Sequence, residues 1–463
     1  MTTLAEPSSW KERLVDSGAG YYLMDADETR GVPVRLFLTP LLLDELEVSV
    51  YPQILTAARF PGVRMVVITP DVHHGYGVPV GCAIVTDPDH GAVALGPVGF
   101  DIGCGMVSLR SDVPADVATE ARRFAFNREV MRRVNMGVGE RGVGRLAGLG
   151  RAEFERLIRG GADYYTRKYG ERIDRTKAER NRIPVDDAWD IPASRADRGI
   201  GQLGSLGGGN HFIELQRSEQ TQTLFVQIHT GSRGFGHGLA EHYFRVAKNE
   251  QPSVIRNLDE AWFPAESPNR WEYLSAVAAG GNYAIINRLV IAEEVSLAFR
   301  TVFGADLQLV YEISHNLVQR EWHPDFGWVN VHRKGATRAF AAGHPALDGT
   351  PWFDTGHPVL IPGSNYDWSY ILRPTGSAKS AYTVNHGAGR RMSRAAAKKQ
   401  LVQAQVDKQY REAGIVVNLD RRVPIDESRA AYKPSGEVIE AITRAGLAEV
   451  EHRLWPLASL KGL

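Results

Sequence analysis

The chain has 463 residues, and its 54 basic and 54 acidic side chains give a formal net charge of +0. Hydrophobic residues make up 43% and charged residues 23%, which is typical of globular proteins and excludes a mainly disordered chain. A neutral chain has no overall attraction for nucleic acid, so any such binding must use a local basic patch.

The cysteine content and the absence of targeting signals indicate where the protein works. Cys82 and Cys104 are the two cysteines, a number that favours a reducing compartment and argues against a disulfide framework. Charged residues interrupt the N-terminal stretch, so it lacks a signal-peptide core. No run approaches the roughly 18 apolar residues of a membrane span. The sequence therefore predicts a cytoplasmic protein with no membrane partner.

The first part of the chain predicts strands separated by glycine-rich loops. Residues 1–62 are expected to be a peripheral start. VRMVVIT (63–69) is β-branched and predicts a buried strand, followed by the loop DVHHGYG and a second strand over CAIVTD (82–87). GPVGFDIGCGMVSLRS (96–111) predicts a loop and then a strand. Residues 112–200 are expected to be largely helical.

The second part alternates strands, loops and helices. TLFVQIHTGSRG (223–234) predicts a strand running into a loop, and residues 282–304 carry apolar residues at helical spacing, which predicts a buried helix. LQLVYEISHN (307–316) predicts a strand that ends at His315. HPVLIPGS (357–364) predicts a strand followed by a loop. Residues 393–410 predict one helix that follows HGAGRR directly.

The motifs that carry chemistry are spread along most of the chain. Basic residues outnumber acidic ones in TRKYGERIDRTKAERNR (166–182), which predicts either a solvated helix or an RNA-facing patch. No internal repeat or low-complexity linker divides the sequence, and its motifs extend from residue 71 to residue 461. We therefore expect a single catalytic domain over residues 1–463.

Five residues in strand-end loops have the character of metal ligands. Asp101 and Cys104 are three residues apart among glycines, and His211, His229 and His315 each lie beside apolar or glycine-rich backbone. Each histidine alone also fits a structural role. A thiolate, a carboxylate and imidazoles together suit Zn²⁺, Mn²⁺ or Fe²⁺. His73 and His74 fit a structural loop or the lining of the site equally well.

The stretch HGAGRR predicts a phosphate site around His386. Glycines let backbone approach a ligand, and Arg390, Arg394 and Lys398, spaced by four, would share one helix face. Arginines and a helix start both favour phosphate. His386 could hold a metal, act as a general acid or base, or attack phosphorus as a nucleophile. Five other ligands are available, so the metal role is the least favoured.

Six motifs in order resemble the RtcB family of RNA-splicing ligases: DVHHGYG, VGFDIGCG, LGGGNHFIE, HTGSRG, PGS…SY and HGAGR. The resemblance extends from about residue 63 to the C-terminal LKG. It implies an α+β fold with mixed β-sheets around a central active-site cleft and surrounding helices. It also implies joining of RNA 3′-phosphate or 2′,3′-cyclic phosphate ends to 5′-hydroxyl ends, in RNA repair or tRNA splicing.

The resemblance also implies a mechanism. GTP is the co-substrate that guanylylates His386, the guanylate passes to the RNA 3′-phosphate, and the 5′-hydroxyl then displaces GMP. Two Mn²⁺ ions would be held by the five candidate ligands, with Cys104 as the bridging thiolate. Some members work with an activating protein, the archease, which is a candidate partner here.

The family's nucleotide and RNA contacts map onto residues of this sequence. Glu214 would read the guanine edge, and Arg233 would hold an RNA phosphate. The implied nucleotide-binding residues are Asn210, His211, Phe212, Ile213, Glu214, His315, Asn316, Pro362, Gly363, Ser364, Asn365, Ser369, His386, Gly387, Ala388, Gly389, Arg390, Tyr432 and Lys461.

The sequence departs from the family pattern at three places. Asn365 and Tyr366 replace the usual Met-Gly, and the bulky Tyr366 is expected to narrow or reshape the nucleotide pocket. Gly103 stands where asparagine is common. The segment 166–200 resembles an insertion relative to compact members.

Two other functions fit parts of this pattern. A metal-dependent phosphodiesterase or cyclic-phosphate hydrolase would share the metal site and need no His386–GMP adduct. A non-catalytic RNA-end binding protein would be expected to lose a metal ligand or the nucleophile, and this sequence keeps all six.

Overall fold

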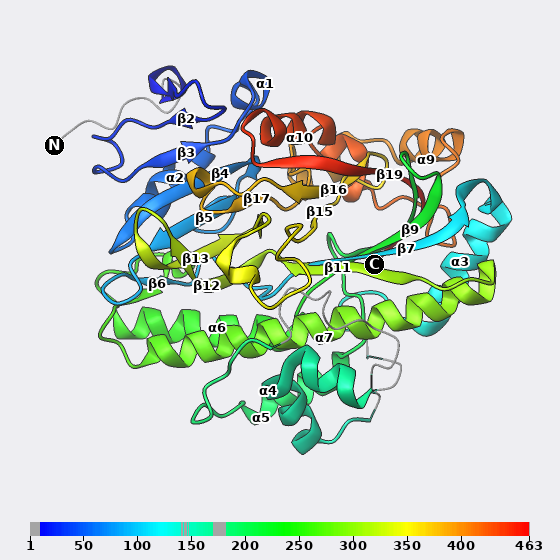
Figure 1. The fold of residues 1–463 in the computed structure, drawn as a ribbon, viewed down its shortest axis with the longest axis horizontal. Helices are drawn as coiled ribbons and strands as arrows, with labels where there is room; N and C mark the ends of the chain where they lie inside the picture. Colours follow the sequence, from blue (N-terminus) through cyan, green and yellow to red (C-terminus); the bar gives the residue numbers. More distant parts are fainter. Residues whose placement is uncertain (1–9, 140–141, 143–145, 147, 170–181, 463) are drawn as a thin grey trace.

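The computed structural model describes residues 10–139, 142, 146, 148–169 and 182–462. Two large β-sheets form its centre, and helices surround them (Figure 1). The seven-stranded sheet contains, in spatial order, β1 (Val15–Asp16), β2 (Tyr22–Leu23), β3 (Val34–Leu36), β4 (Val63–His73), β5 (Val80–Thr86), β13 (Gly327–Lys334) and β12 (Asn316–His323). The eight-stranded sheet contains β11 (Gln308–Ser314), β7 (Gly105–Pro114), β9 (Thr223–Thr230), β8 (Phe212–Ser218), β19 (Ala448–Lys461), β16 (Ser369–Pro374) and β15 (Val359–Ile361), with β18 (Val416–Val417) paired to β19.

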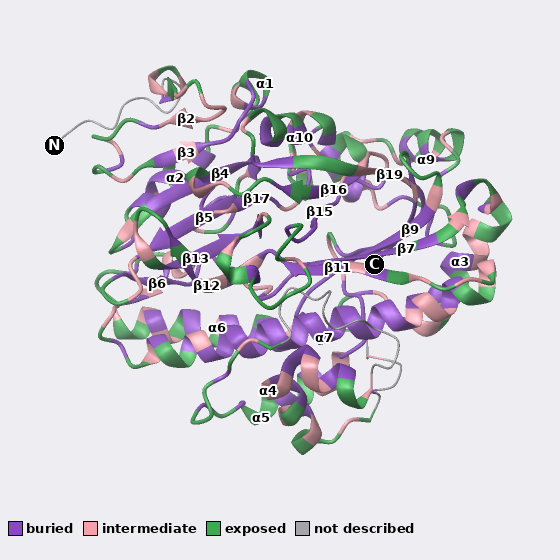
Figure 2. Cartoon of the chain, viewed as in Figure 1, coloured by how far each residue is buried: buried purple, intermediate pink, exposed green. Residues whose placement is uncertain are grey.

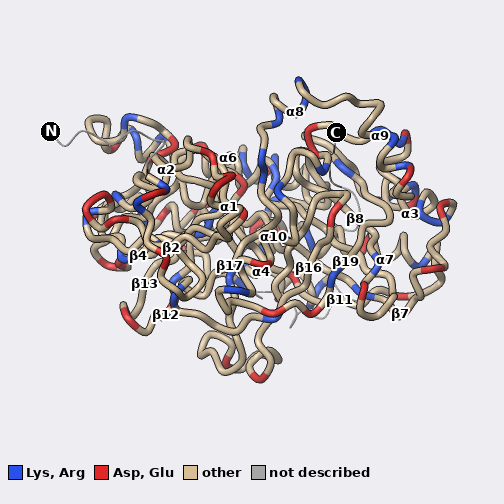
Figure 3. The backbone as a smooth tube through the Cα atoms, turned by 90° about the horizontal axis from the view of Figure 1, so that it is seen from above, with Lys and Arg blue, Asp and Glu red and all other residues tan. Residues whose placement is uncertain are grey.

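Both sheets are mixed, because β3 pairs with β4 and β18 pairs with β19 in parallel while the other pairs are antiparallel. Two short antiparallel pairs join β6 (Val93–Ala94) to β10 (Trp262–Phe263) and β14 (Ala336–Arg338) to β17 (Thr383–Asn385). Basic and acidic residues are interspersed along the chain, in keeping with its neutral net charge (Figure 3). The architecture is the α+β fold with mixed sheets that the sequence predicted.

The helices lie around the sheets, and the longest is the apolar α7. The α-helices are α1 (Pro40–Asp44), α2 (Val50–Ala58), α3 (Glu120–Arg133), α4 (Arg151–Lys168), α5 (Ala193–Gln202), α6 (Arg233–Glu250), α7 (Asn269–Phe303), α8 (Arg394–Gln400), α9 (Gln403–Glu412) and α10 (Ser435–Arg444). Helix α7 packs against α3, α4 and α6 and against strands of the eight-stranded sheet. It is apolar and long enough to cross a membrane, but 94% of its most apolar window is buried inside the protein (Figure 2). The helix predicted over 282–304 is thus confirmed and begins earlier, at Asn269.

The predicted strands are present, and one of them is longer than expected. Strand β4 runs through Asp71 to His73, so the start of DVHHGYG is strand rather than loop. The pairing of β4 with β5 is irregular between Ile68 and His73, which accommodates Pro70 and its missing N–H. The strand predicted to end at His315 does so, because His315 lies between β11 and β12. These two strands belong to different sheets, so His315 marks the point where the sheets meet.

The segment 112–200 is helical only in part. Strand β7 continues to Pro114, and α3, α4 and α5 follow it. Of the charged stretch 166–182, the residues up to Lys168 belong to α4, and residues 170–181 lie outside the described part of the chain.

The single helix predicted over 393–410 is wrong. Leu401 and Val402 adopt extended conformations and separate α8 from α9. The break lets α9 bury Val406 and Tyr410 in a small apolar cluster, so tertiary packing overrides helix propensity here. Arg390 precedes α8 and pairs with Tyr432 in an isolated bridge. The shared helix face proposed for Arg390, Arg394 and Lys398 is therefore wrong for Arg390.

Candidate active site

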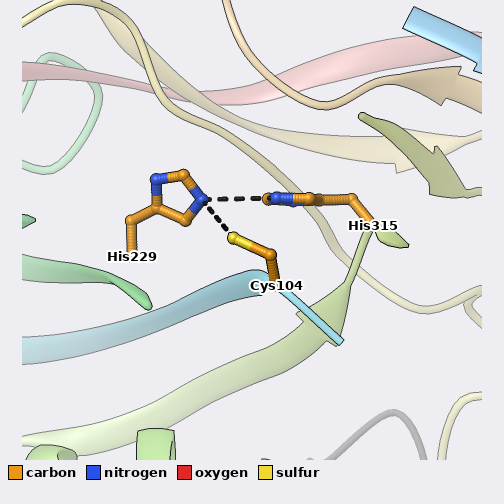
Figure 4. Close-up of side chains that lie close together, drawn as sticks. All are labelled: Cys104, His229 and His315. Carbon is orange, nitrogen blue, oxygen red and sulfur yellow. Dashed lines mark hydrogen bonds between the residues drawn. The ribbon is translucent and has the colours of Figure 1, made fainter. Parts of the chain in front are cut away.

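Five candidate metal ligands converge at the junction of the two sheets. Cys104 Sγ lies 3.2 Å from His229 Nε2 and 3.6 Å from His211 Nε2, and the Nε2 atoms of His229 and His315 are 3.3 Å apart (Figure 4). His211 Nε2 also lies 3.1 Å from an Asp101 carboxylate oxygen. The residues form two sets of potential ligands, one with His229 and His315 and one with Asp101 and His211, and Cys104 belongs to both. A thiolate shared in this way could bridge two cations.

Backbone carbonyls orient two of these histidines. His211 Nδ1 lies 3.0 Å from the carbonyl oxygen of Leu206, and His229 Nδ1 lies 3.1 Å from that of Asn210. A carbonyl can only accept, so each Nδ1 carries a proton, and each Nε2 is turned toward the shared centre, where it could offer a lone pair to a cation. This is the usual arrangement for metal-bound histidine. Burial also lowers the pKa values of His229 and His315 well below the usual range, which keeps these imidazoles neutral.

The acidic ligands show why a cation suits the site. Burial, together with the Asp101 carboxylate, raises the pKa of the Cys104 thiol well above its usual value. Burial also raises the pKa of Asp101, but the hydrogen bond and charge of His211 outweigh it and leave that pKa lowered. A thiol that must lose its proton here needs a nearby positive charge. The donor set therefore fits one or more divalent cations of borderline softness.

Arg288 of α7 donates hydrogen bonds to residues next to three of the candidate metal ligands. Its guanidinium donates to the carbonyls of Gly103 (2.6 Å) and Thr230 (2.9 Å) and to Ser314 Oγ (2.8 Å). These residues directly precede or follow Cys104, His229 and His315. Arg288 also forms a fully buried ion pair with Glu312. The sequence reasoning missed Arg288, because its partners are distant in the chain.

Gly103 also brings the loop that holds Asp101 and Cys104 close to α7. Its φ is +72°, and a Cβ there would lie 2.9 Å from the Ala284 side chain and 3.0 Å from Gly281 Cα of α7. The asparagine expected from the family pattern would need this helix to shift. Glycine at position 103 thus allows the loop that holds Asp101 and Cys104 to pack closely on α7.

A buried aspartate holds His386. Asp71 Oδ2 accepts hydrogen bonds from His386 Nδ1 at 2.6 Å, from the His386 backbone N–H at 3.1 Å and from the Gly387 N–H at 3.2 Å. Thr69 Oγ1 donates to the other carboxylate oxygen at 2.6 Å. Burial raises the pKa of Asp71, but the charge and hydrogen bonds of His386 outweigh it and keep that pKa lowered. The ionised Asp71 fixes a proton on Nδ1 and leaves Nε2 as the ring nitrogen available for chemistry.

His386 shares one cavity of about 400 Å³ with four of the candidate metal ligands, Asp101, Cys104, His229 and His315, whereas His211 lies behind its lining. The His386 and His315 rings are 4.8 Å apart between centroids. Gly335 makes room for the nucleophile: its φ is +56°, and a Cβ there would lie 2.9 Å from His386 Cε1. The cavity is lined from both sheets, and His73 is among its lining residues, which favours the second of the two interpretations of that histidine. Other lining residues are Asn210, Phe212, Asn316, Pro362, Gly363, Gly387, Ala388, Gly389, Arg390, Arg394, Tyr432 and Lys461.

Cations on one wall of the cavity gather around a buried carboxylate. Glu427 Oε1 lies 2.9 Å from Arg394 Nη2 and 3.2 Å from Arg390 Nη1, and its other oxygen lies 3.6 Å from Lys461 Nζ. Tyr432 donates its hydroxyl hydrogen to Glu427 as well. The Asp426 carboxylate also lies 3.9 Å from Arg394, so three positive charges face two carboxylates and leave a net positive wall, which suits phosphate. Sequence reasoning identified the cations but missed Glu427.

Glu214 and Ser369 lie together beyond the cavity lining. Glu214 is 2% exposed, and Gln216 Nε2 donates to its carboxylate at 2.7 Å and to Ser369 Oγ at 3.1 Å. Burial raises the pKa of Glu214 to about 7, against the opposing effects of Gln216 and Lys461. Lys461 Nζ lies over the ring of Phe212, 5.0 Å from its centroid. The apolar ring of Phe212 and the carboxylate of Glu214 therefore both lie near Lys461.

Tyr366 does not narrow the cavity in the way its size suggests. Its ring packs on Tyr410 and Trp455, with centroid separations of 4.9 and 5.9 Å, and it lines a neighbouring cavity of about 410 Å³. Asn365 is 2% exposed, and its Oδ1 accepts from the Tyr410 hydroxyl. Asn365 and Tyr366 therefore contribute to packing next to the loop that was predicted to bind a nucleotide.

The remaining predicted residues have mixed placements. Arg233 begins α6, is 9% exposed, and donates to Ser205 Oγ and the Gly137 carbonyl, so its guanidinium is largely used within the protein. Asn316 donates to the Asp101 carbonyl and accepts from the Gly335 N–H, which holds the metal-site loop. Ile213 is buried in β8, and Ser364 Oγ accepts from the Tyr366 N–H at 3.4 Å.

Comparisons with known proteins agree with this geometry. A family model described as "tRNA-splicing ligase RtcB" matches residues 53–462. The RNA-splicing ligase RtcB of Mycobacterium tuberculosis is 36% identical over 434 residues, covering 89% of this chain and 100% of the relative. The tRNA-splicing ligase RtcB of Pyrobaculum aerophilum is 34% identical, covering 93% of this chain and 95% of the relative. That of Thermococcus kodakarensis is 32% identical, covering 94% and 96%.

Proposed function

Because the chain belongs to the RtcB family of tRNA-splicing ligases and is thus an RNA ligase, we propose that it uses GTP and Mn²⁺ to join RNA ends through a covalent His386–GMP intermediate. Its substrates would be a 3′-phosphate or 2′,3′-cyclic phosphate end and a 5′-hydroxyl end. The observation that carries the proposal is that His386, held by Asp71, lines the same cavity as Asp101, Cys104, His229 and His315, which belong to two sets of potential metal ligands.

The donor set fits two Mn²⁺ ions. Asp101 and His211 would hold one, His229 and His315 the other, and Cys104 both. Bound there, divalent cations supply charge neutralisation for phosphate oxygens. The chain's own residues provide the remaining chemistry: Arg390, Arg394 and Lys461 offer cations to phosphate groups, and the aromatic rings of Phe212 and Tyr432 offer faces to a base.

The first step would be attack by His386. Nε2 forms a bond to the α-phosphorus of GTP while the bond from that phosphorus to the bridging oxygen of pyrophosphate breaks, and pyrophosphate leaves. Asp71 supports this step, because its negative charge stabilises the positive charge that develops on the imidazole.

Two transfers would then complete the reaction. An oxygen of the RNA 3′-phosphate attacks the histidine-bound phosphorus, the N–P bond breaks, and His386 is released as a neutral imidazole. The 5′-hydroxyl oxygen next attacks the RNA 3′-phosphorus and loses its proton, and GMP departs. The phosphoanhydride bond of GTP is thus replaced in turn by a phosphoramidate bond to His386, a new phosphoanhydride bond and finally a phosphodiester bond, and because no atom changes oxidation state, no redox partner is needed.

A ligation assay tests this function. Purified protein with Mn²⁺, GTP and two RNAs, one ending in a 3′-phosphate and one beginning with a 5′-hydroxyl, should give a joined product, and His386→Ala should give none. The cyclic-phosphate hydrolase is the competing function, and on an RNA that ends in a 2′,3′-cyclic phosphate it predicts opened ends without joining, at equal rates in the presence and absence of GTP. Joining by His386→Ala at the wild-type rate would contradict the proposal.

Location and partners follow from the same proposal. We propose a cytoplasmic site of action, in line with the two cysteines of the chain, neither of which is disulfide-bonded. An archease-like activator is the candidate protein partner, and adding one to the ligation assay measures whether turnover depends on it.

A further inference from the structure

Strand β12 leads from the active site to the surface. It begins at Asn316, which lines the catalytic cavity, and it is the last strand of the seven-stranded sheet. Alternate side chains of a strand share one side, so Val318, Arg320 and Trp322 follow Asn316 on the same side. Val318 is partly exposed, and Arg320 and Trp322 are exposed. At about 3.3 Å per residue, Trp322 lies roughly 20 Å along the strand from the cavity.

The far end of this row carries two exposed indole rings. Trp322 pairs directly with Trp328 across the β12–β13 hairpin, and the two rings meet edge to face with centroids 5.8 Å apart. Trp322 is 49% exposed and Trp328 is 52% exposed. The guanidinium carbon of Arg320 lies 5.6 Å from the centre of the Trp328 ring. A positive charge therefore lies over the ring of Trp328, and both indole rings are about half exposed to solvent.

We propose that Arg320, Trp322 and Trp328 form a stacking platform for single-stranded RNA whose end lies at His386. Exposed aromatic rings interleaved with arginine are the usual means of holding unpaired strands without sequence preference, because every base has a face to stack and every linkage a phosphate. A protein with no net charge needs such a local site. The row on β12 connects the platform to the cavity without a break in the chain.

This proposal rests on the proposed function, because an end-joining enzyme must hold the strand that leads to the reacting end. The competing explanation is structural: a cross-strand aromatic pair can stabilise a hairpin without binding anything. The two explanations differ in what removal of the rings changes. The platform predicts loss of RNA affinity, and the structural pair predicts loss of thermal stability alone.

The test compares RNA binding by variants of the full chain. Fluorescence anisotropy measures the Kd of a labelled single-stranded RNA of about 12 nucleotides, a length within the range of such sites. A dinucleotide with the same 3′-phosphate is too short to reach the platform. The variants are Trp322→Ala, Trp328→Ala, the double variant, and Trp322→Phe, which keeps an aromatic face.

The control variant is Leu419→Ala. Leu419 is also an exposed apolar residue, at 41%, and its neighbour Asn418 contacts Asn127 of α3, on the other side of the molecule from β12 and β13 (Figure 1). Labelling of His386 by α-labelled GTP, which uses no RNA, is measured on every variant as a check on folding and on the proposed function.

The platform predicts that each Trp→Ala change weakens binding of the longer RNA by about ten-fold, the usual effect of removing one stacked base. Trp322→Phe and Leu419→Ala should bind it nearly as the wild type does, and dinucleotide binding should be unchanged in all variants. An unchanged Kd for the longer RNA in the double variant would overturn the platform. Absence of GTP labelling in the wild type, with RNA affinity still dependent on the rings, would instead count against the proposed nucleotidyl transfer and leave the platform standing.

Discussion

At the scale of single residues, the state of His386 depends on Asp71. The carboxylate accepts from Nδ1 and from two backbone N–H groups, so it sets both the ring orientation and the position of the proton. An amide in its place would present an N–H toward Nδ1 or lose the charge that stabilises the imidazolium. The proposed nucleophile, His386, therefore depends on Asp71 for its orientation and protonation.

Asp71→Asn should lower the rate at which GTP labels His386 by at least about 100-fold, as expected when a buried aspartate partner of a catalytic histidine is neutralised. Thr69→Val removes one hydrogen bond to Asp71 but keeps its charge, and should cost about ten-fold or less. Rates of label incorporation into the denatured chain measure both effects. Labelling of Asp71→Asn at the wild-type rate would show that His386 needs no such partner.

If Glu214 accepts from guanine as proposed, its pKa, raised to about 7 by burial, would make GTP affinity depend on pH near neutrality. The guanine edge offers N–H donors, which the carboxylate accepts and the protonated acid does not. We expect GTP affinity to fall about ten-fold for each pH unit below about 7, and Glu214→Gln to abolish this dependence. Calorimetric titration from pH 6 to 8 measures it.

The same raised pKa affects stability with a definite sign. Folding favours the protonated form of Glu214, so its contribution to stability is present at low pH and is lost as pH rises through about 7. The melting temperature of Glu214→Gln should therefore exceed that of the wild type at pH 8, and the difference should shrink as the pH falls from about 7 toward the ordinary glutamate pKa of 4.5. An opposite trend would mean that the folded protein prefers the ionised form.

At the scale of elements, α7 supports the metal site through Arg288. One guanidinium from this helix joins the loop before β7, the end of β9 and the end of β11, each beside a metal ligand. Its buried partner Glu312 would lose this counter-charge if Arg288 were removed. A helix that does not line the cavity thus sets the relative positions of the candidate metal ligands.

Arg288→Met should lower the free energy of unfolding by about 3–5 kcal/mol, because it strands a buried carboxylate. The double variant Arg288→Met/Glu312→Leu should recover most of that stability, since no charge is left unpaired. It should not recover Mn²⁺ affinity, because the three strand ends lose their common donor. Denaturant unfolding and metal titration separate the two effects; recovery of both in the double variant would assign Arg288 a purely structural role.

The two ligand sets predict a graded metal content. His211→Ala should lower the bound metal from two ions per chain to one, and His315→Ala should do the same through the other set. Cys104→Ala should weaken both sites, because its sulfur belongs to both. Elemental analysis after dialysis against Mn²⁺ measures the content. Equal loss in all three variants would indicate a single site.

At the scale of the whole molecule, the candidate site residues at strand ends could be predicted from the sequence, whereas the residues that hydrogen-bond to them could not. Cys104, His229 and His315 follow or precede recognisable strands, and the α+β fold followed from the motif order. Asp71 is 315 residues from His386, and no local pattern joins them. The break between α8 and α9 arises from packing of Val406 and Tyr410, which propensity does not contain.

Both sheets are needed to build the cavity, because β12 and β13 bring Asn316 and Lys334 from one sheet while β8 and β9 bring Phe212 and His229 from the other.

The central claim is that His386, held by Asp71 in this cavity, becomes covalently guanylylated. The most direct measurement incubates the protein with α-labelled GTP and Mn²⁺ and looks for label on the denatured chain. We predict acid-labile label on the wild type and none on His386→Ala. Equal label on His386→Ala, or none on wild-type protein that binds Mn²⁺ and GTP, would contradict the claim.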